Sequence, residues 1–131
     1  QSLITDFEGA LAEQFVGQEL LASFPFFKEA KLYYWSREAK SSNAEVDYLL
    51  QKENEIYPLE VKAGKTGTLK SMQVYLGEKN KTIGIRLNLD RPNFGKTLQA
   101  KVMVSKKEKS ITYSLLSMPM YFAGCLNKIN F

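Results

Sequence analysis

Two apolar runs joined by a short polar segment constrain the fold of this chain most strongly. The runs cover residues 46–50 and 56–61, and the segment between them reads QKENE. Apolar runs of strand length on either side of a polar reversal are typical of two antiparallel neighbours in a sheet. We therefore expect a β-hairpin over residues 45–62, with the rest of the chain built around it.

The charged residues of this hairpin follow the alternation of a strand. Successive side chains point to opposite faces, so Glu60 and Lys62 share one face of the second strand. The same rule places Glu45 and Asp47 together on one face of the first strand. If the two faces coincide, three carboxylates and one ammonium group converge on a small patch.

Such a patch is unfavourable without a counter-ion, because like charges repel and a half-buried carboxylate loses hydration. A divalent cation removes this cost, since Mg²⁺ takes hard oxygen ligands and is usually held by one or two carboxylates. A lysine next to a ligand can then stabilise developing negative charge or position an attacking water. The alternative is the charged face of an ordinary hairpin, and it stays open at this point because short motifs produce false positives.

Composition narrows the remaining classes. With 131 residues, 44% hydrophobic and 24% charged content, the chain fits one globular domain over residues 1–131. The complete lack of histidine excludes His-dependent zinc sites and Ser/His/Asp or Cys/His catalysis. A net charge of +4 permits binding to a polyanion without requiring it.

The cysteine count, the apolar runs and the first residue give weaker indications of the compartment and of the extent of the full protein. The single cysteine, Cys125, forbids an internal disulfide and fits a reducing compartment such as the cytoplasm. No apolar run approaches the roughly 20 residues of a membrane span, so we expect no membrane segment. Because the chain begins at Gln1 and not at methionine, we expect it to be a fragment of a longer protein.

The order of the predicted elements indicates a mixed sheet. We expect helices over residues 5–24, 69–79 and 119–128, and strands besides the hairpin over residues 32–35, 82–89, 98–104 and 110–116. A helix between the hairpin and the next strand implies a parallel pair, whereas the early strands imply antiparallel pairs. We therefore expect an α/β fold, with helices flanking a mixed central sheet and a C-terminal hairpin and helix. The predicted core consists of Val46, Val61, Ile83 and Ile85, covered by Leu11, Phe15 and Leu20.

Three polar side chains fall on or beside predicted apolar surfaces. In the first helix, Glu19 lies inside the apolar arc and Glu13 at its edge, so each either joins a site or is an edge carboxylate that reaches water. Gln73 lies on the apolar side of the second helix.

Two GKT segments, at residues 64–66 and 95–97, end like a phosphate-binding loop. That loop needs a further glycine upstream, which is absent in both places, so we expect no nucleotide cofactor. Lys65, Lys70 and the lysine-rich turn SKKEK either contact nucleic-acid phosphates or are simply solvated.

Several segments resemble known families. Asp47 followed by Glu60-x-Lys62 resembles the motif of the PD-(D/E)XK nuclease superfamily, although Val46 stands where the motif has proline. In addition, nearly the full chain resembles the C-terminal domain of unknown function that follows the ATPase module in a large family of bacterial and archaeal AAA+ ATPases. The matching segments are Gly9-x-x-x-Glu13, Glu19-Leu20, residues 32–35 (LYYW), Glu45-Val46-Asp47, residues 58–62 (PLEVK) and residues 118–121 (MPMY).

The resemblance implies a PD-(D/E)XK nuclease-like fold and assigns roles within it. Asp47 and Glu60 would be the ligands of Mg²⁺ or Mn²⁺, and Lys62 would lie near the attacking water. Glu13 would be the acid supplied by the first helix, although helical phase alone favours Glu19. The candidates for supporting residues are Glu19, Glu45 and Gln73.

Three functions stay open. The first is metal-dependent hydrolysis of phosphodiester bonds in DNA or RNA, in which Mg²⁺ or Mn²⁺ activates water and neutralises developing charge. The second is a catalytically inactive docking or regulatory module for an AAA+ ATPase domain in the same full-length chain. The third is a nucleic-acid-binding module that contacts phosphates through lysines. The fold cannot decide among them, because function depends on the site.

Overall fold

The structure is a computed structural model that describes residues 3–25, 29–38, 43–63 and 69–131. Its elements are α1 (Leu3–Ala22), β1 (Tyr33–Arg37), β2 (Ala44–Lys52), β3 (Glu55–Val61), α2 (Lys70–Lys79), β4 (Ile83–Asn88), β5 (Asn93–Val104), β6 (Lys107–Pro119) and the 3-10 helix η1 (Met120–Lys128). This order confirms the predicted succession of elements. No helix within the described ranges has the length and apolar character needed to cross a membrane.

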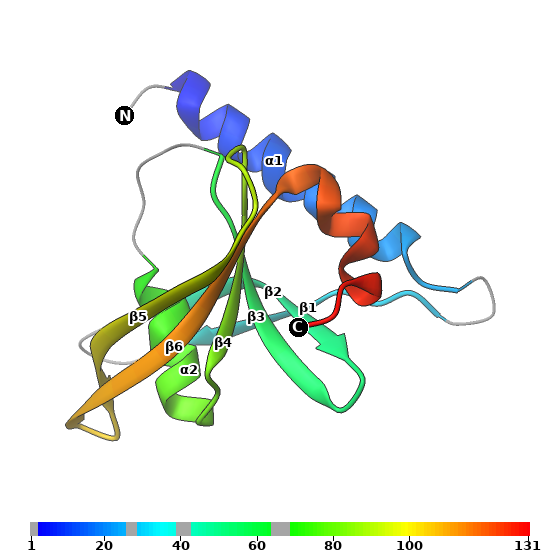
Figure 1. The fold of residues 1–131 in the computed structure, drawn as a ribbon. Helices are drawn as coiled ribbons and strands as arrows, with labels where there is room; N and C mark the ends of the chain where they lie inside the picture. Colours follow the sequence, from blue (N-terminus) through cyan, green and yellow to red (C-terminus); the bar gives the residue numbers. More distant parts are fainter. Residues whose placement is uncertain (1–2, 26–28, 39–42, 64–68) are drawn as a thin grey trace.

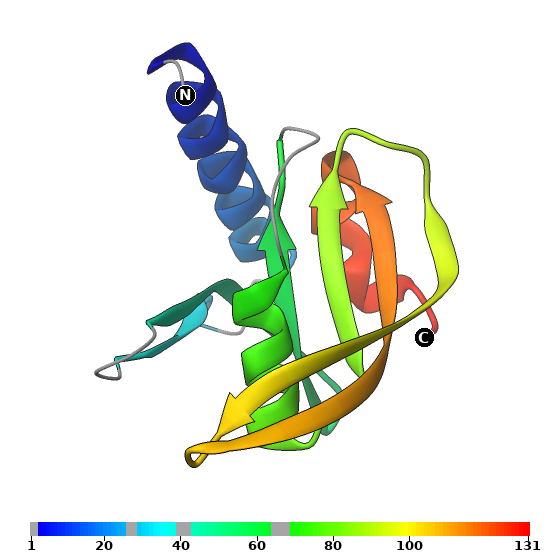
Figure 2. The ribbon, with the colours of Figure 1, turned by 90° about the vertical axis from the view of Figure 1, so that its left-hand side faces the viewer.

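The six strands form one mixed sheet in the order β1-β2-β3-β4-β6-β5, which confirms the predicted α/β class. Strands β1, β2 and β3 form an antiparallel meander, and β5 pairs antiparallel with β6. Strand β3 pairs parallel with β4, and β4 pairs parallel with β6. In Figure 2 the arrowheads of β3, β4 and β6 consequently point toward the same end of the sheet. Because parallel neighbours need a crossover, α2 lies between β3 and β4 in the chain.

Helices cover both faces of the sheet. Figure 1 shows α1 and η1 together on one side and α2 on the other. The buried core under α1 and η1 contains Val16, Leu20, Leu59, Ile85, Leu87, Met118 and Leu126. The core under α2 contains Val46, Met72, Tyr75, Leu76, Tyr113 and Leu115.

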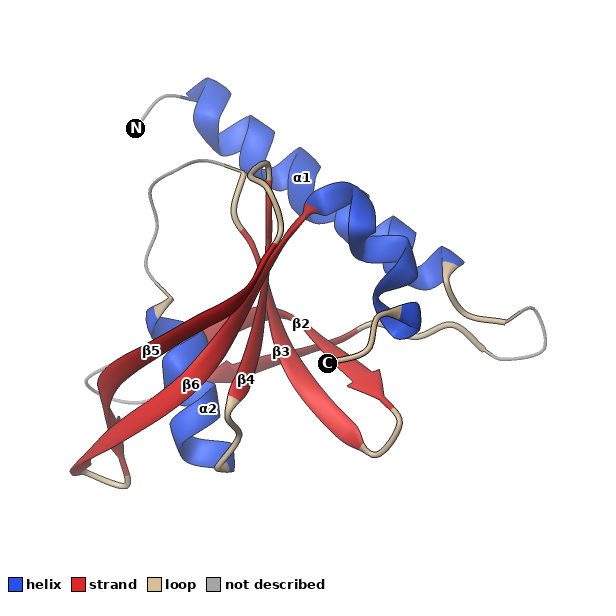
Figure 3. Cartoon of the chain, in the orientation of Figure 1, coloured by secondary structure: helices blue, strands red, loops and turns tan. Residues whose placement is uncertain are grey.

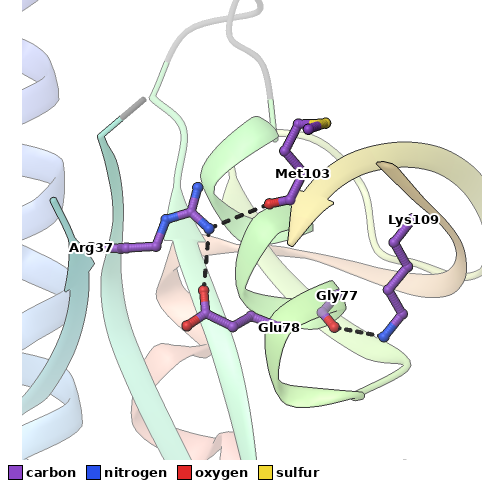
Figure 4. A network of polar contacts seen from close by, with 5 residues as sticks. All are labelled: Arg37, Gly77, Glu78, Met103 and Lys109. Carbon is purple, nitrogen blue, oxygen red and sulfur yellow. Dashed lines mark hydrogen bonds and ion pairs between the residues drawn. The ribbon is translucent and has the colours of Figure 1, made fainter. Parts of the chain in front are cut away.

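Polar contacts hold the outer strands against the C-terminal half of α2 (Figure 4). Arg37 of β1 donates from Nη1 to Oε2 of Glu78 and to the backbone oxygen of Met103 on β5, both at 3.4 Å. Lys109 of β6 donates from Nζ to the backbone oxygen of Gly77 at 2.8 Å. The C-terminal half of α2 is thereby tied to β1 and β6, and Arg37 also links β1 to β5.

The packing of α1 differs from the prediction in its phase. Leu20 is buried as predicted, but Leu11 and Phe15 are 49% and 41% exposed. The buried positions of α1 are Ala12, Val16 and Leu20, which recur every four residues and form one narrow stripe. The predicted arc was too wide because α1 packs mainly against η1, a short element that covers only one line of the helix. In the sheet, Val46 and Ile85 are buried as predicted, whereas Val61 and Ile83 are only half-buried.

The C-terminal segment also differs from the predicted helix. It is a 3-10 helix, interrupted at Cys125 by a non-helical conformation with φ −127° and ψ 17°. Figure 3 shows η1 following directly from the end of β6. Close packing on α1 accompanies this shape, because a Cβ added at Gly124 would lie 2.8 Å from Oε2 of Glu19. The buried side chain of Leu126 anchors the segment in the core.

Gly17 provides a test of how α1 packs on the sheet. A Cβ at Gly17 would lie 2.5 Å from Oη of Tyr48, whereas a Cβ at Gly9 would meet nothing within 4 Å. Alanine is favoured over glycine inside a helix by about 1 kcal/mol, so we expect Gly9→Ala to raise the free energy of unfolding. We expect Gly17→Ala to lower it by about 1–3 kcal/mol, because Tyr48 or α1 has to move. Urea unfolding of both variants measures the difference.

The control for this comparison is Tyr48→Phe, which removes the closest atom. In that background Gly17→Ala should be less destabilising than in the parent. Equal unfolding free energies for Gly9→Ala and Gly17→Ala would contradict the contact between α1 and Tyr48.

Candidate functional site

Five charged residues singled out in the sequence come together at one pocket. Helix α1 contributes Glu13, β2 contributes Glu45 and Asp47, β3 contributes Glu60, and Lys62 follows directly after β3. The pocket is open to solvent, has a volume of about 350 Å³, and is completed by Ser71 from the first turn of α2. The strand faces that carry the charges therefore coincide, as the hairpin pattern predicts.

The register of β2 and β3 places Asp47 against Glu60. Tyr48 pairs with Leu59, so the next residue on each strand brings the two carboxyl groups opposite each other. Asp47 accepts a hydrogen bond through Oδ2 from the backbone N–H of Val61 at 2.9 Å. This bond fixes the orientation of the Asp47 carboxylate at the end of the β2–β3 ladder.

Glu60 is the most unusual residue of the pocket. It is only 5% exposed, and its Oε1 is buried without a hydrogen-bond partner among the described residues. Burial, followed by the charge of Asp47 and a hydrogen bond with it, raises the pKa of Glu60 to about 8, although Lys62 acts in the opposite direction. This shift favours the protonated form of Glu60 at pH 7. Such a carboxyl group loses its proton when a cation binds to its oxygens.

Helix α1 is positioned over the pocket by Tyr48. The Tyr48 hydroxyl donates to the backbone oxygen of Glu13 at 2.9 Å, which holds that turn of α1 above β2. Partial burial, together with the charges of Asp47 and Glu45, raises the pKa of Glu13. The pKa of Tyr48 is raised by burial and by the charges of Glu13 and Asp47. Electrostatic repulsion therefore reaches across the pocket from β2 to α1.

Lys62 supplies the positive charge of the pocket. Its backbone N–H donates to the oxygen of Leu87 at 2.8 Å, which extends the parallel pairing of β3 with β4 by one residue. Its half-buried side chain makes no hydrogen bond or ion pair with the described part of the chain. The ammonium group is therefore available to an anion that enters the pocket.

Ser71 was not predicted from the sequence. Its Oγ accepts a hydrogen bond from the backbone N–H of Glu45 at 3.1 Å, which joins the start of β2 to the first turn of α2. No local pattern distinguishes this serine, since its role depends on a neighbour far away in the chain.

The structure places the other candidates away from the pocket. Glu19 lies beside Gly124 of η1, whereas Glu13 lines the pocket. Gln73 donates from Nε2 to the hydroxyl of Tyr113 at 2.9 Å, so it links α2 to β6 and does not support the carboxylates. Lys70 is exposed on the first turn of α2 and does not line the pocket. Lys65 lies outside the described residues.

The donor set fits a hard divalent cation. Asp47, Glu60 and Glu13 offer carboxylate oxygens, and the buried Oε1 of Glu60 has no other donor to satisfy it. Among the residues that the structure describes, no group of three or more acidic or cysteine side chains already stands in a metal-holding arrangement. Metal binding would therefore require these carboxylates to rotate, and Glu60 would release its proton.

Comparison with known proteins gives one match. Residues 8–113 match the model of a family described as "Domain of unknown function (DUF4143)". No curated protein and no solved structure matches the chain.

The raised pKa of Glu60 predicts how stability depends on pH in the metal-free protein. The folded state retains the Glu60 proton up to about pH 8, whereas the unfolded chain loses it near pH 4.5. The free energy of unfolding should therefore fall between these values, by up to about 1.4 kcal/mol per pH unit. Glu60→Gln keeps a neutral group of the same size and should remove this slope. Denaturant unfolding in EDTA at a series of pH values compares the two proteins.

The difference in unfolding free energy between Glu60→Gln and the parent should have a defined sign at each pH. Glu60→Gln should match the parent below pH 4.5 and be more stable above pH 8. Parallel profiles for the two proteins would show that Glu60 is ionised in the folded state. The exposed Glu8 of α1 provides the control, because Glu8→Gln should leave the slope unchanged.

Proposed function

The chain belongs to the DUF4143 family, and we propose that it is a metal-dependent phosphodiesterase that acts on nucleic acid. The observation that carries the proposal is the buried Oε1 of Glu60, for which the described part of the chain offers no donor although Asp47 lies opposite. A carboxyl group is costly to bury without a partner. A divalent cation held by Asp47 and Glu60 supplies that partner.

The proposed reaction is hydrolysis. The oxygen of a water molecule bonds to phosphorus, the bond to one ester oxygen breaks, the water loses a proton and the leaving oxygen gains one. A bound Mg²⁺ or Mn²⁺ would activate the water and neutralise charge on the phosphoryl oxygens. Lys62 adds positive charge at those oxygens, since its side chain has no partner among the described residues. Glu13 is the candidate acceptor for the proton, because α1 brings it to the pocket from the side opposite the strands.

The fold supports the same proposal. The order α-β-β-β-α-β, with the acidic pair on the second and third strands, resembles the core of PD-(D/E)XK nucleases. The longer resemblance suggests that the domain follows the ATPase module of an AAA+ ATPase within a cytoplasmic protein. These points are analogies and weigh less than the site itself.

A second candidate function is a docking module without catalytic activity. Leu11 and Phe15 lie one turn apart on α1 and are 49% and 41% exposed, which is typical of a surface that contacts a partner. Metal binding at the carboxylates is not expected for such a module. The metal experiment below therefore separates the two candidates.

Calorimetric titration with Mn²⁺ tests the metal site. We expect binding heat in the parent, and a gain in unfolding free energy of about 2.7 kcal/mol at 100 times the dissociation constant. Asp47→Asn should abolish both, yet leave the metal-free protein as stable as the parent or more so, because the amide oxygen can still accept the Val61 N–H. Glu8→Gln, an exposed change on α1, should leave the heat unchanged.

Lys62→Ala separates metal binding from catalysis. Lysine is not a ligand of Mg²⁺, so binding heat should survive, whereas cleavage of single- and double-stranded DNA and of RNA should fall by about 100-fold or more. Cleavage that persists unchanged in both Asp47→Asn and Lys62→Ala would come from a contaminant. Binding heat without cleavage of any probe would favour the docking module.

A further inference from the structure

A row of polar side chains continues from the pocket across the sheet. Glu60 on β3 pairs in register with Arg86 on β4, and Arg86 pairs in register with Ser117 on β6. Partners in register on parallel strands share a face, so the three side chains lie in one line. Among the described residues, Glu60, Ser117 and Asn88 are the buried polar side chains, and all three lie near the C-terminal ends of β3, β6 and β4.

Arg86 is the cation of this row, and the residues that the structure describes give it no anionic partner. Its Nε and Nη2 both donate to Oγ of Ser117, at 3.2 and 2.9 Å. The guanidinium forms no ion pair with an aspartate or glutamate of the described chain, although it is half-buried. Half-buried arginines are usually paired, because a guanidinium carries five donors and a full charge. Nη1 and one N–H of Nη2 therefore remain for a ligand.

The guanidinium of Arg86 is oriented toward β6 and not toward β3. Glu60 lies beside it on β3 and has an oxygen without a donor, yet the guanidinium turns the other way, toward Ser117. Arg86 is thus held by Ser117 and forms no ion pair with an acid of the described residues, so its remaining donors can bind an anionic ligand.

We propose that Arg86, oriented by Ser117, binds the phosphate of a nucleic-acid backbone that is adjacent to the phosphate held at the Asp47–Glu60 pocket. This inference rests on the proposed function and identifies the path of the substrate. Neighbouring strands lie about 5 Å apart, so a guanidinium directed toward Ser117 lies roughly 5–10 Å from the backbone of Glu60. That separation suits the next phosphate along a strand, and Arg86 accordingly does not line the pocket itself.

A further lysine lies on the same face of the sheet, on β5. Lys96 of β5 pairs with Leu115, which is two residues before Ser117 on β6 and shares its face. Lys62 directly after β3, Arg86 on β4 and Lys96 on β5 thus lie on one face of the sheet, with β6 between β4 and β5. The nucleic acid would run across the strands from the pocket toward β5.

Binding of fluorescent single-stranded DNA and RNA tests the proposal. All proteins carry Lys62→Ala so that the probes stay intact, and binding is measured with and without Mn²⁺ over a range of salt concentrations. Arg86→Gln should weaken binding by about 10- to 100-fold, as expected for the loss of charged hydrogen bonds. It should also reduce the slope of log K against log salt by about 0.7, the value for one phosphate contact on a single strand. Arg86→Lys and Ser117→Ala, which keep the charge without the oriented fork, should give smaller losses.

The matched control is Lys79→Gln, which removes one positive charge from the exposed C-terminal end of α2, and it should change affinity less than twofold. Thermal melts and Mn²⁺ heat verify that each variant is folded.

If Arg86→Gln binds like Lys79→Gln, the proposal is wrong even where Mn²⁺ binds and the proposed function stands. If Mn²⁺ gives no heat in the parent, the proposed function fails, and the Arg86 comparison without metal still decides whether Arg86 binds phosphate. Competition by inorganic phosphate as strong as that by oligonucleotide would indicate a free-phosphate site and contradict the backbone path.

Discussion

The parallel pairing of β3 with β4 and of β4 with β6 determines most of this structure. Parallel neighbours need a crossover, and α2 provides it on one face, so α1 and η1 must cover the other. With both faces covered, the buried positions of the parallel strands are mostly apolar. The buried polar side chains among the described residues, Glu60, Asn88 and Ser117, lie near the C-terminal ends of these strands, which meet at one edge. Ligands of open α/β sheets bind outside the carboxyl ends of the strands, which is where Glu60, Arg86 and Ser117 lie.

The burial of Glu60 shows the energetic conflict at this edge. A side chain at 5% exposure normally contributes to stability through apolar contact, yet here it carries a carboxyl group that is neutral only because it holds a proton. This proton relieves the repulsion from Asp47 but leaves one oxygen unsatisfied. Local conflicts of this kind, in a fold whose other features agree with one another, are expected at functional sites.

Much of the fold and of the pocket could be predicted from the sequence. The alternation in residues 46–50 and 56–61 correctly placed Glu45, Asp47, Glu60 and Lys62 on coinciding faces, because strand periodicity depends only on local geometry. The element order likewise predicted the parallel pair. Helical phase was less reliable, since the exposure of Leu11 and Phe15 depends on the width of the partner η1 and not on α1 itself.

The residues that the sequence did not reveal depend on contacts between distant segments. Ser71 acquires its role from Glu45, which is 26 residues away, and no property of the first turn of α2 announces that contact. Arg86 alternates with Ile85 and Leu87 as any solvent-facing strand residue would. Its place between Glu60 and Ser117, without an ion pair to any acid of the described chain, becomes visible only when β3, β4 and β6 are placed in register.

On the proposed function, the charges of the pocket would also favour one order of ligand binding. With Glu60 protonated, the carboxylates of Glu13, Glu45 and Asp47 outnumber the ammonium of Lys62, so the metal-free pocket repels a polyanion. A divalent cation reverses this balance locally. Arg86 stands one strand away from that repulsion and can hold a phosphate before the pocket itself attracts one. On the proposed function, Arg86 therefore retains the backbone at the sheet edge, and the cation then draws the neighbouring phosphate into the pocket.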